Sequence, residues 1–222
     1  MLSIGSSIYY RPKDKAMHAD NARMNFARGG GGDHLALMRV FDQWVDTGHS
    51  VQWCFENYLQ HRLLSKARDV REQLVGLCDR VEVDAGASSS DPEGVCKAMT
   101  AGYFYNTARL GRTGEYKTTK QQHTVYIHPS SVLMPRIAKP EGGESKEQEQ
   151  KRREEEEKAM QSLPKWLMFH ELAFTTKEYM RQCCPIKGSW LVEIAPHYYQ
   201  ASDVQEQQGG RMPNLKSRAK AA

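Results

Sequence analysis

Hydrophobic residues recur every three to four positions through residues 33–83, and every second position in stretches farther along the chain. The first spacing is that of an amphipathic helix and the second is that of a half-buried strand. The pattern therefore predicts an α+β protein in which an N-terminal helical bundle is followed by a β-rich unit.

The helical part is predicted to begin at Asp33, which we expect to be an N-cap, and its first helix is expected to end at Gly48. Ser50 is expected to cap a short second helix. Two apolar stripes support these helices: Leu37, Phe41, Trp44 and Val45 in the first, and Leu63, Ala67, Val70, Leu74, Leu77, Cys78 and Val81 in a longer third helix. We assign residues 33–84 to this bundle and residues 1–32 to a lead-in segment.

The β-rich unit is predicted over residues 93–200. It should contain a helix at Glu93–Phe104, strands at His123–His128, Trp166–Thr175 and Tyr179–Ile186, and a short terminal helix within Trp190–Tyr199. About five short strands with a helix beside them suit a small barrel of the oligonucleotide/oligosaccharide-binding (OB) type.

Three segments have compositions that disfavour a packed core. Residues 85–92 read as a linker, residues 136–164 as a charged low-complexity insertion, and residues 201–222 as a basic tail. We expect the insertion and the tail to be disordered.

The bulk composition sets limits on the class of protein. Hydrophobic residues make up 39% of the chain and the net charge is +4, so the chain is only mildly basic. The five cysteines include no C-x-x-C pair, which favours buried free thiols over a disulfide framework or a zinc site. Without a secretory signal or a long apolar run, we expect a soluble intracellular protein.

Residues 111–118, GRTGEYKT, have a partial likeness to a phosphate-binding loop. Gly111, Lys117 and Thr118 stand at the offsets of G-x-x-x-x-G-K-[ST], but Tyr116 replaces the second glycine. A β-patterned run follows where such a loop would open a helix. We therefore expect no ATP binding here, and instead a hairpin turn in which Gly111 and Gly114 supply the special backbone angles.

Metal and hydrolase motifs are also missing. His170 and Glu171 are not followed by the second histidine of H-E-x-x-H, because position 174 is phenylalanine. The chain contains no G-x-S-x-G motif either. We expect no catalytic residues and no metal site.

Basic and aromatic residues alternate through the strand-and-turn region, as in proteins that grip single-stranded nucleic acid. They are Arg109, Arg112, Lys117, Lys120, Lys177 and Arg181, beside Tyr103, Tyr105, Tyr116, Tyr126 and Tyr179. The alternative is that the aromatic residues belong to the barrel core and the lysines are simply solvated. The pattern alone supports the two interpretations about equally.

Longer blocks add a family resemblance. GGDHLALMRVFDQW, KAMTAGYFYNTARL, TVYIHPSSVL, PKWLMFHELAFTTKEYMRQ and SWLVEIAPHYY resemble, in order, the C-terminal region of DEAH-box RNA helicases. YRPKDK, HADNAR and KARDVREQL are most similar to the spliceosomal members that act before the first splicing step. The resemblance implies a helical ratchet-like domain followed by an OB-fold domain, in a nuclear protein of mRNA splicing.

In that family, single-stranded RNA passes between the motor domains and these C-terminal domains. The resemblance assigns RNA contacts to Lys117, Thr118, Lys120, His128, Ser130, Thr175, Thr176 and Lys177, with Arg68 and Arg71 as candidates on the helical side. It implies helicase motor domains, spliceosomal proteins and a G-patch activator as further partners.

The parent family hydrolyses ATP with Mg²⁺, but its phosphate loop, DEAH box and arginine-finger motifs are absent from this sequence. We therefore expect no cofactor and no ATPase activity from this chain alone, and a fragment, a truncated gene model or one product of a split gene. A protein-interaction module that docks spliceosomal or G-patch partners is the alternative function.

Overall fold

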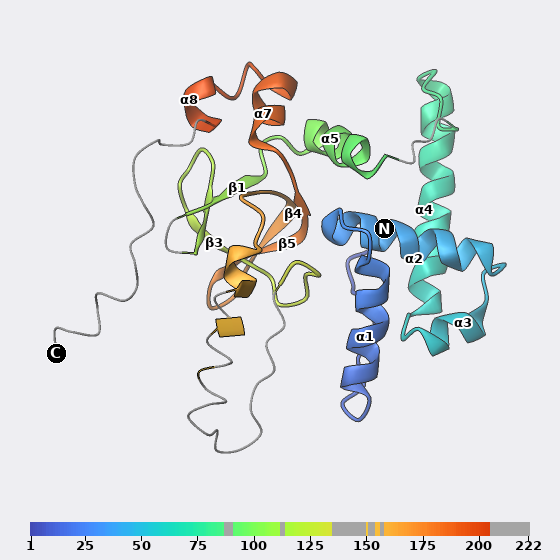
Figure 1. Ribbon diagram of the computed structural model, residues 1–222. Coiled ribbons are helices and arrows are strands. Elements are labelled where there is room, and N and C mark those ends of the chain that lie inside the picture. Colours follow the sequence, from blue (N-terminus) through green and yellow to red (C-terminus); the bar gives the residue numbers. More distant parts are fainter. Residues whose placement is uncertain (87–90, 112–113, 135–149, 151–153, 156–157, 205–222) are drawn as a thin grey trace.

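The computed structural model describes residues 1–86, 91–111, 114–134, 150, 154–155 and 158–204. A helical unit comes first and lies beside a barrel of strands (Figure 1). The elements, in chain order, are α1 (Ala16–Ala27), α2 (Gly32–Asp46), α3 (Val51–Glu56), α4 (His61–Arg80), α5 (Pro92–Gly102), β1 (Thr107–Leu110), β2 (Tyr116–Thr118), β3 (Thr124–Ile127), β4 (Trp166–Phe174), β5 (Glu178–Pro185), α7 (Gly188–Ile194) and α8 (Ala201–Val204). This order confirms the predicted α+β architecture.

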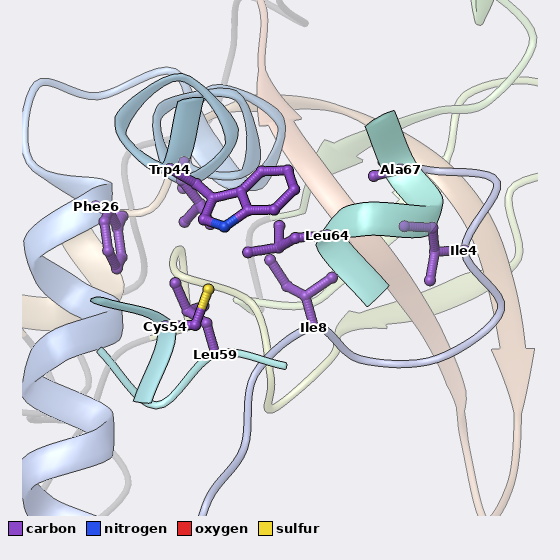
Figure 2. Close-up of a cluster of buried hydrophobic side chains, with 10 residues drawn as sticks. Ile4, Ile8, Phe26, Trp44, Cys54, Leu59, Leu64 and Ala67 are labelled. Atoms are coloured by element: carbon purple, nitrogen blue, oxygen red, sulfur yellow. The ribbon is translucent and has the colours of Figure 1, made fainter. Parts of the chain in front are cut away.

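The helical unit packs around Trp44 of α2, whose side chain is fully buried. Apolar side chains from the N-terminal segment and from α1 to α4 surround it (Figure 2): Ile4, Ile8, Phe26, Ala36, Val40, Cys54, Leu59, Leu64 and Ala67. Removal of such side chains from water contributes about 1.5–3 kcal/mol each for the larger ones. The lead-in segment is therefore part of this core.

The apolar face predicted for α4 is buried only in its first half. Ala67 is buried and Leu63 is partly buried, whereas Leu74, Leu77 and Val81 are 53%, 50% and 67% exposed. Leu64, which was not part of the predicted face, is fully buried. The second half of α4 extends beyond the helices that cover the first half (Figure 1). The sequence pattern identified an amphipathic helix but could not show where its partners end.

The helix boundaries test three predicted caps. Ser50 is confirmed, because its side chain accepts a hydrogen bond from the Trp53 backbone nitrogen at 3.2 Å. Gly48 follows the end of α2 with a φ of +65°, as expected for a helix stop. The prediction for Asp33 is wrong: Gly31 is the N-cap of α2, and Asp33 lies in the first turn.

Helix α1 falls in a region where no element was predicted. It has only two buried side chains, Ala19 and Phe26, so its sequence carries little hydrophobic periodicity. An exposed ion pair between Arg11 and Asp20, 3.0 Å long, joins the preceding loop to the helix. Packing against α2, more than its own pattern, explains its formation.

The five strands close into a barrel in the order β1-β2-β3-β5-β4. The β3–β5 pair is parallel and the other pairs are antiparallel. Alternate side chains fill the interior: Ala108, Tyr116, Val125, Ile127, Leu167, Phe169, Met180 and Cys183. The predicted closed five-stranded barrel is confirmed.

The segment GRTGEYKT directly follows β1 and includes β2, and the two strands form an antiparallel hairpin as predicted. Gly114 has a φ of +82°, whereas Gly111 does not take the left-handed conformation, so only one of the two glycines has the expected role. Gly111 instead donates a backbone hydrogen bond to Glu115 at 2.7 Å. The Tyr116 ring is buried in the barrel core. This position is therefore part of the core and does not serve as the second glycine of a phosphate-binding loop.

The two units meet at the start of α2. The Asp33 carboxylate is buried and accepts three hydrogen bonds, from the Ser131 hydroxyl (2.6 Å), the Val132 nitrogen (2.7 Å) and the Cys183 nitrogen (2.8 Å). Leu35 of the same helix turn is buried with Trp166 and other side chains of the barrel unit. The helical unit and the barrel are therefore joined by both polar and apolar contacts.

The remaining segments differ in part from their predictions. Residues 201–204 of the predicted tail form α8, and most of the predicted insertion lies outside the described residues. Its C-terminal end is ordered, since Leu163 packs against the barrel core and the Pro164 carbonyl accepts a hydrogen bond from Tyr116 at 2.6 Å. All five cysteines are free thiols, as predicted, and four of them are buried.

Candidate nucleic-acid interface

Five side chains line the outer surface of the β3–β5 pair, which we call the barrel face: Tyr126, His128, Lys177, Tyr179 and Arg181. The parallel register places Tyr126 directly beside Tyr179, with ring centroids 6.3 Å apart. Because side chains alternate along a strand, Val125, Ile127 and Met180 point into the core while Tyr126, Tyr179 and Arg181 point outward. His128 directly follows β3 and Lys177 directly precedes β5. The two strands thus build a continuous row of aromatic and basic groups.

Lys177 lies in the short turn between β4 and β5. Its Nζ atom is 4.2 Å from the centroid of the Tyr126 ring, a cation–π distance. The neighbouring Thr175 and Thr176 are exposed, so their hydroxyls are accessible at the same edge of the barrel. The structure therefore brings three predicted contact residues together with two tyrosines.

A groove of about 420 Å³ runs beside these groups. Its lining includes Gly114 from the β1–β2 connection and Lys177 from the β4–β5 connection, with Tyr126 and Tyr179 between them. Met134, Met160 and Leu163 add an apolar wall. The groove combines flat rings, an apolar surface and one cation, which are the features that hold an unstacked base and its phosphate.

His128 stands at the other end of the barrel face. Its ring lies 5.7 Å from that of Tyr179, and its Nδ1 accepts a hydrogen bond from the Ser130 backbone nitrogen at 3.0 Å. This contact leaves the proton of the neutral ring on Nε2. Burial and, to a smaller extent, the nearby Arg181 and Arg23 lower the pKa of His128, which favours that neutral form.

Three further predicted residues lie around the β2–β3 hairpin. Lys117 is exposed on β2, opposite Thr124, and extends the outer surface of the barrel. Thr118 is buried, and its hydroxyl accepts a hydrogen bond from the His123 nitrogen at 3.0 Å. Lys120 forms an ion pair with Asp203 at 2.7 Å. Thr118 and Lys120 therefore have structural partners within the protein.

Arg68 and Arg71 belong to α4 and are not brought to the barrel face (Figure 1). Arg68 forms ion pairs with Asp69 at 3.0 Å and with Glu72, four residues farther along the helix, at 3.8 Å. Exposed pairs of this kind contribute little to stability.

Tyr126, Tyr179 and Arg181 complete the face; they belong to the basic and aromatic set that the sequence pattern singled out, but they are not among the contacts that the family resemblance assigns. The outward position of Tyr126 could be predicted, because the alternation along β3 puts its side chain on the other face of the strand from the buried Val125. The position of Tyr179 depends on the pairing of β3 with β5, whose residues are 53 positions apart in the matched pair Tyr126↔Tyr179. No local pattern encodes that pairing.

Neither a metal-ion cluster nor a membrane-spanning helix is found among the residues that the structure describes. Within the described ranges, no three histidine, cysteine, aspartate or glutamate side chains are grouped so that they could hold a metal ion. Of the helices that the structure describes, none is long and apolar enough to cross a membrane.

The comparison with known families agrees with the barrel topology. Residues 95–198 match the family model described as the oligonucleotide/oligosaccharide-binding (OB) fold. In this fold, the surface of strands 2 and 3 and the β1–β2 and β4–β5 loops form the usual oligonucleotide-binding side. Gly114 and Lys177 come from those two loops. Residues 95–198 therefore fold as an OB-type barrel and are similar to the OB-fold domain found in the C-terminal regions of DEAH/RHA helicases.

Proposed function

We propose that this chain is the RNA-binding C-terminal module of a spliceosomal DEAH-box helicase, and that it holds single-stranded RNA on the barrel face. The observation that carries the proposal is the position of Lys177 over the Tyr126 ring, with Tyr179 alongside. The lysine would neutralise a phosphate while the rings stack on bases, which requires no particular sequence. The exposed hydroxyls of Thr175 and Thr176 lie where they could contact phosphate or the 2′-OH.

The catalytic step belongs to motor domains that would act with this chain. The sequence has no complete phosphate-binding loop, and its closest approach to one is the β1–β2 hairpin. We expect no release of inorganic phosphate from ATP by the purified chain, with or without RNA. ATP turnover that survives purification to homogeneity would contradict this assignment.

Binding of oligouridylate over a range of salt concentrations tests the proposal. Lys177→Ala should weaken binding and reduce the slope of log K against log salt by about 0.7, the value for one lost phosphate contact on a single strand. Lys120→Ala removes the same charge from a lysine that is paired with Asp203, so it is the matched control and should leave the slope unchanged. Affinity for RNA no greater than for polyvinyl sulfate of equal charge would overturn the proposal.

One observation favours a second function, the docking of a protein partner. Leu74 and Leu77 of α4 and Val81, the C-cap of this helix, are exposed apolar side chains. Leu77→Ser should then abolish binding to the motor domains of a spliceosomal DEAH-box helicase, supplied as a separate chain, without changing RNA affinity. The combined substitution of Lys117 and Lys177 by alanine should have the opposite effect if RNA is the ligand: RNA binding is weakened and binding of the motor domains is retained.

A further inference from the structure

The outward-facing row on β3 continues past the barrel face. Thr124 is exposed at the start of this strand, and it pairs with the exposed Lys117 on β2. The turn that joins the two strands carries Lys120, which is exposed as well. A single strand of RNA that lies along β3 from Tyr126 toward this turn would therefore reach two further lysines, as a strand does in a groove that follows the nucleic-acid backbone.

Lys120 stands against aromatic rings, the arrangement already seen at the barrel face. Its Nζ atom is 5.5 Å from the ring centroid of Tyr198 and 5.4 Å from that of Tyr199. The Tyr199 ring is buried, and hydrogen bonds join its hydroxyl to that of Thr107 at 2.6 Å and the latter to the Thr119 hydroxyl at 2.8 Å. This buried network holds the residue that precedes Lys120, so the lysine has a fixed base.

An anion already lies at this lysine. The Asp203 carboxylate of α8 is 2.7 Å from the Lys120 Nζ atom, and α8 lies next to the β2–β3 hairpin (Figure 1). The same carboxylate accepts a hydrogen bond from the Gln200 backbone nitrogen at 2.9 Å. The bond from Lys120 and, to a smaller extent, the bond from Gln200 lower the pKa of Asp203, which keeps it charged. A carboxylate oxygen at this distance makes the charge-assisted contact that a phosphate oxygen makes with lysine.

The contact that fills the site is light. Helix α8 has four residues and none of them is buried, although Val204 packs at the edge of the neighbouring core. The Lys120 and Asp203 side chains are 35% and 27% exposed, and exposed ion pairs contribute little to stability. Asp203 nevertheless has the advantage over a strand phosphate, because it belongs to the same chain and its effective concentration at Lys120 is high.

We infer that Lys120 and the Tyr198 ring form a second nucleotide-binding site on the path of the RNA, and that Asp203 keeps this site closed by taking the place of a phosphate. The inference rests on the proposed function, because the ligand is a further nucleotide of the strand held on the barrel face. The family resemblance assigned an RNA contact to Lys120, and the pairing with Asp203 explains why that contact is blocked in this structure. Helix α8 therefore limits the length of strand that the barrel can hold.

Asp203→Asn tests the inference, because it removes the charge and keeps an oxygen that can accept the bond from the Gln200 nitrogen. The full chain should then bind an oligouridylate with a slope of log K against log salt that is steeper by about 0.7, the value for one added phosphate contact on a single strand. The affinity at about 0.1 M salt should rise about fivefold, the factor that such a slope gives between about 1 M and 0.1 M salt. Fluorescence anisotropy measures both quantities.

Two further variants make the result specific. Addition of Lys120→Ala to Asp203→Asn should return the affinity and the slope to those of the parent chain, because the cation of the site is then missing. Glu193→Gln is the matched control, since it removes the same charge from another exposed ion pair of this unit, the 2.6 Å pair with Lys97. It should change neither the affinity nor the slope.

The results separate this inference from the proposed function. An Asp203→Asn variant that binds no more tightly than the Glu193→Gln control, or a gain that persists without Lys120, would overturn the inference even if Lys177→Ala weakens binding as proposed. If Asp203→Asn strengthens binding through Lys120 while Lys177→Ala has no effect, the second site is supported and the proposal for the barrel face fails.

Discussion

The Asp33 carboxylate lies 2.8 Å from the backbone nitrogen of Cys183, a residue 150 positions farther along the chain. The same carboxylate accepts hydrogen bonds from Ser131 and Val132, so one buried side chain joins the helical unit to two segments of the barrel. A buried carboxylate costs free energy unless it is fully hydrogen-bonded, and here it is.

Asp33→Asn should destabilise the protein by about 3 kcal/mol, because the amide replaces a charged acceptor and presents an N–H group to donors. Urea denaturation monitored by tryptophan fluorescence measures the change. Asp42→Asn, on the exposed side of the same helix, is the control and should change stability little. Similar losses in the two variants would show that the three bonds to Asp33 contribute no special stability.

Gly32 allows the backbone of α2 to approach β5 closely. A Cβ atom at this position would lie 2.3 Å from the Cys183 carbonyl oxygen, and the glycine has a φ of +69°. Gly32→Ala should therefore cost the conformational penalty of about 1–2 kcal/mol and about 1–3 kcal/mol more for the clash. Gly30→Ala has a similar φ of +77° but open space around the added methyl, so it should show the conformational penalty alone. Equal unfolding midpoints for the two variants would contradict this explanation.

Tyr179→Leu should weaken the binding of single-stranded RNA by about 1–3 kcal/mol, the contribution of one base stacked on an aromatic ring. Tyr179→Phe keeps the ring between Tyr126 and His128 and should bind nearly as tightly as the parent chain. Fluorescence anisotropy with a labelled oligouridylate distinguishes the two. A phenylalanine variant as weak as the leucine variant would show that the hydroxyl, and not stacking, is responsible.

His34 gives the fold a specific dependence on pH. Burial, with a smaller contribution from His170, lowers the pKa of His34 to about 4, below the ordinary value of 6.5. The unfolded chain therefore binds a proton that the folded chain does not, and stability is lost as the pH falls from about 6.5 toward 4, by up to about 3 kcal/mol. Urea midpoints at several pH values in this window measure the loss. His34→Gln should flatten the dependence, whereas His18→Gln, exposed on α1, should leave it as in the parent chain.

The elements with strong periodicity could be predicted from the sequence. Val125 and Ile127 are buried as their alternation indicated, and the long β4 strand and the cap at Ser50 are where the pattern placed them. These features depend on neighbours within a few residues. The helix α1 was missed because only Ala19 and Phe26 of its side chains are buried.

The interface could be predicted only in part, because it depends on contacts between distant residues. Lys177 was expected on the basis of family resemblance, but its position over Tyr126 follows from the pairing of β3 with β5. Asp33 looked like an ordinary cap, since nothing nearby in the sequence reveals that its hydrogen-bond donors lie 98, 99 and 150 positions away.

The burial of Leu35 among Trp166, Trp190 and Leu191 has a practical consequence for dissecting the molecule. A recombinant piece that starts at α5 would lack this leucine and would expose two tryptophans to solvent. We expect such a truncated piece to aggregate, so any minimal soluble version of the barrel must retain α2.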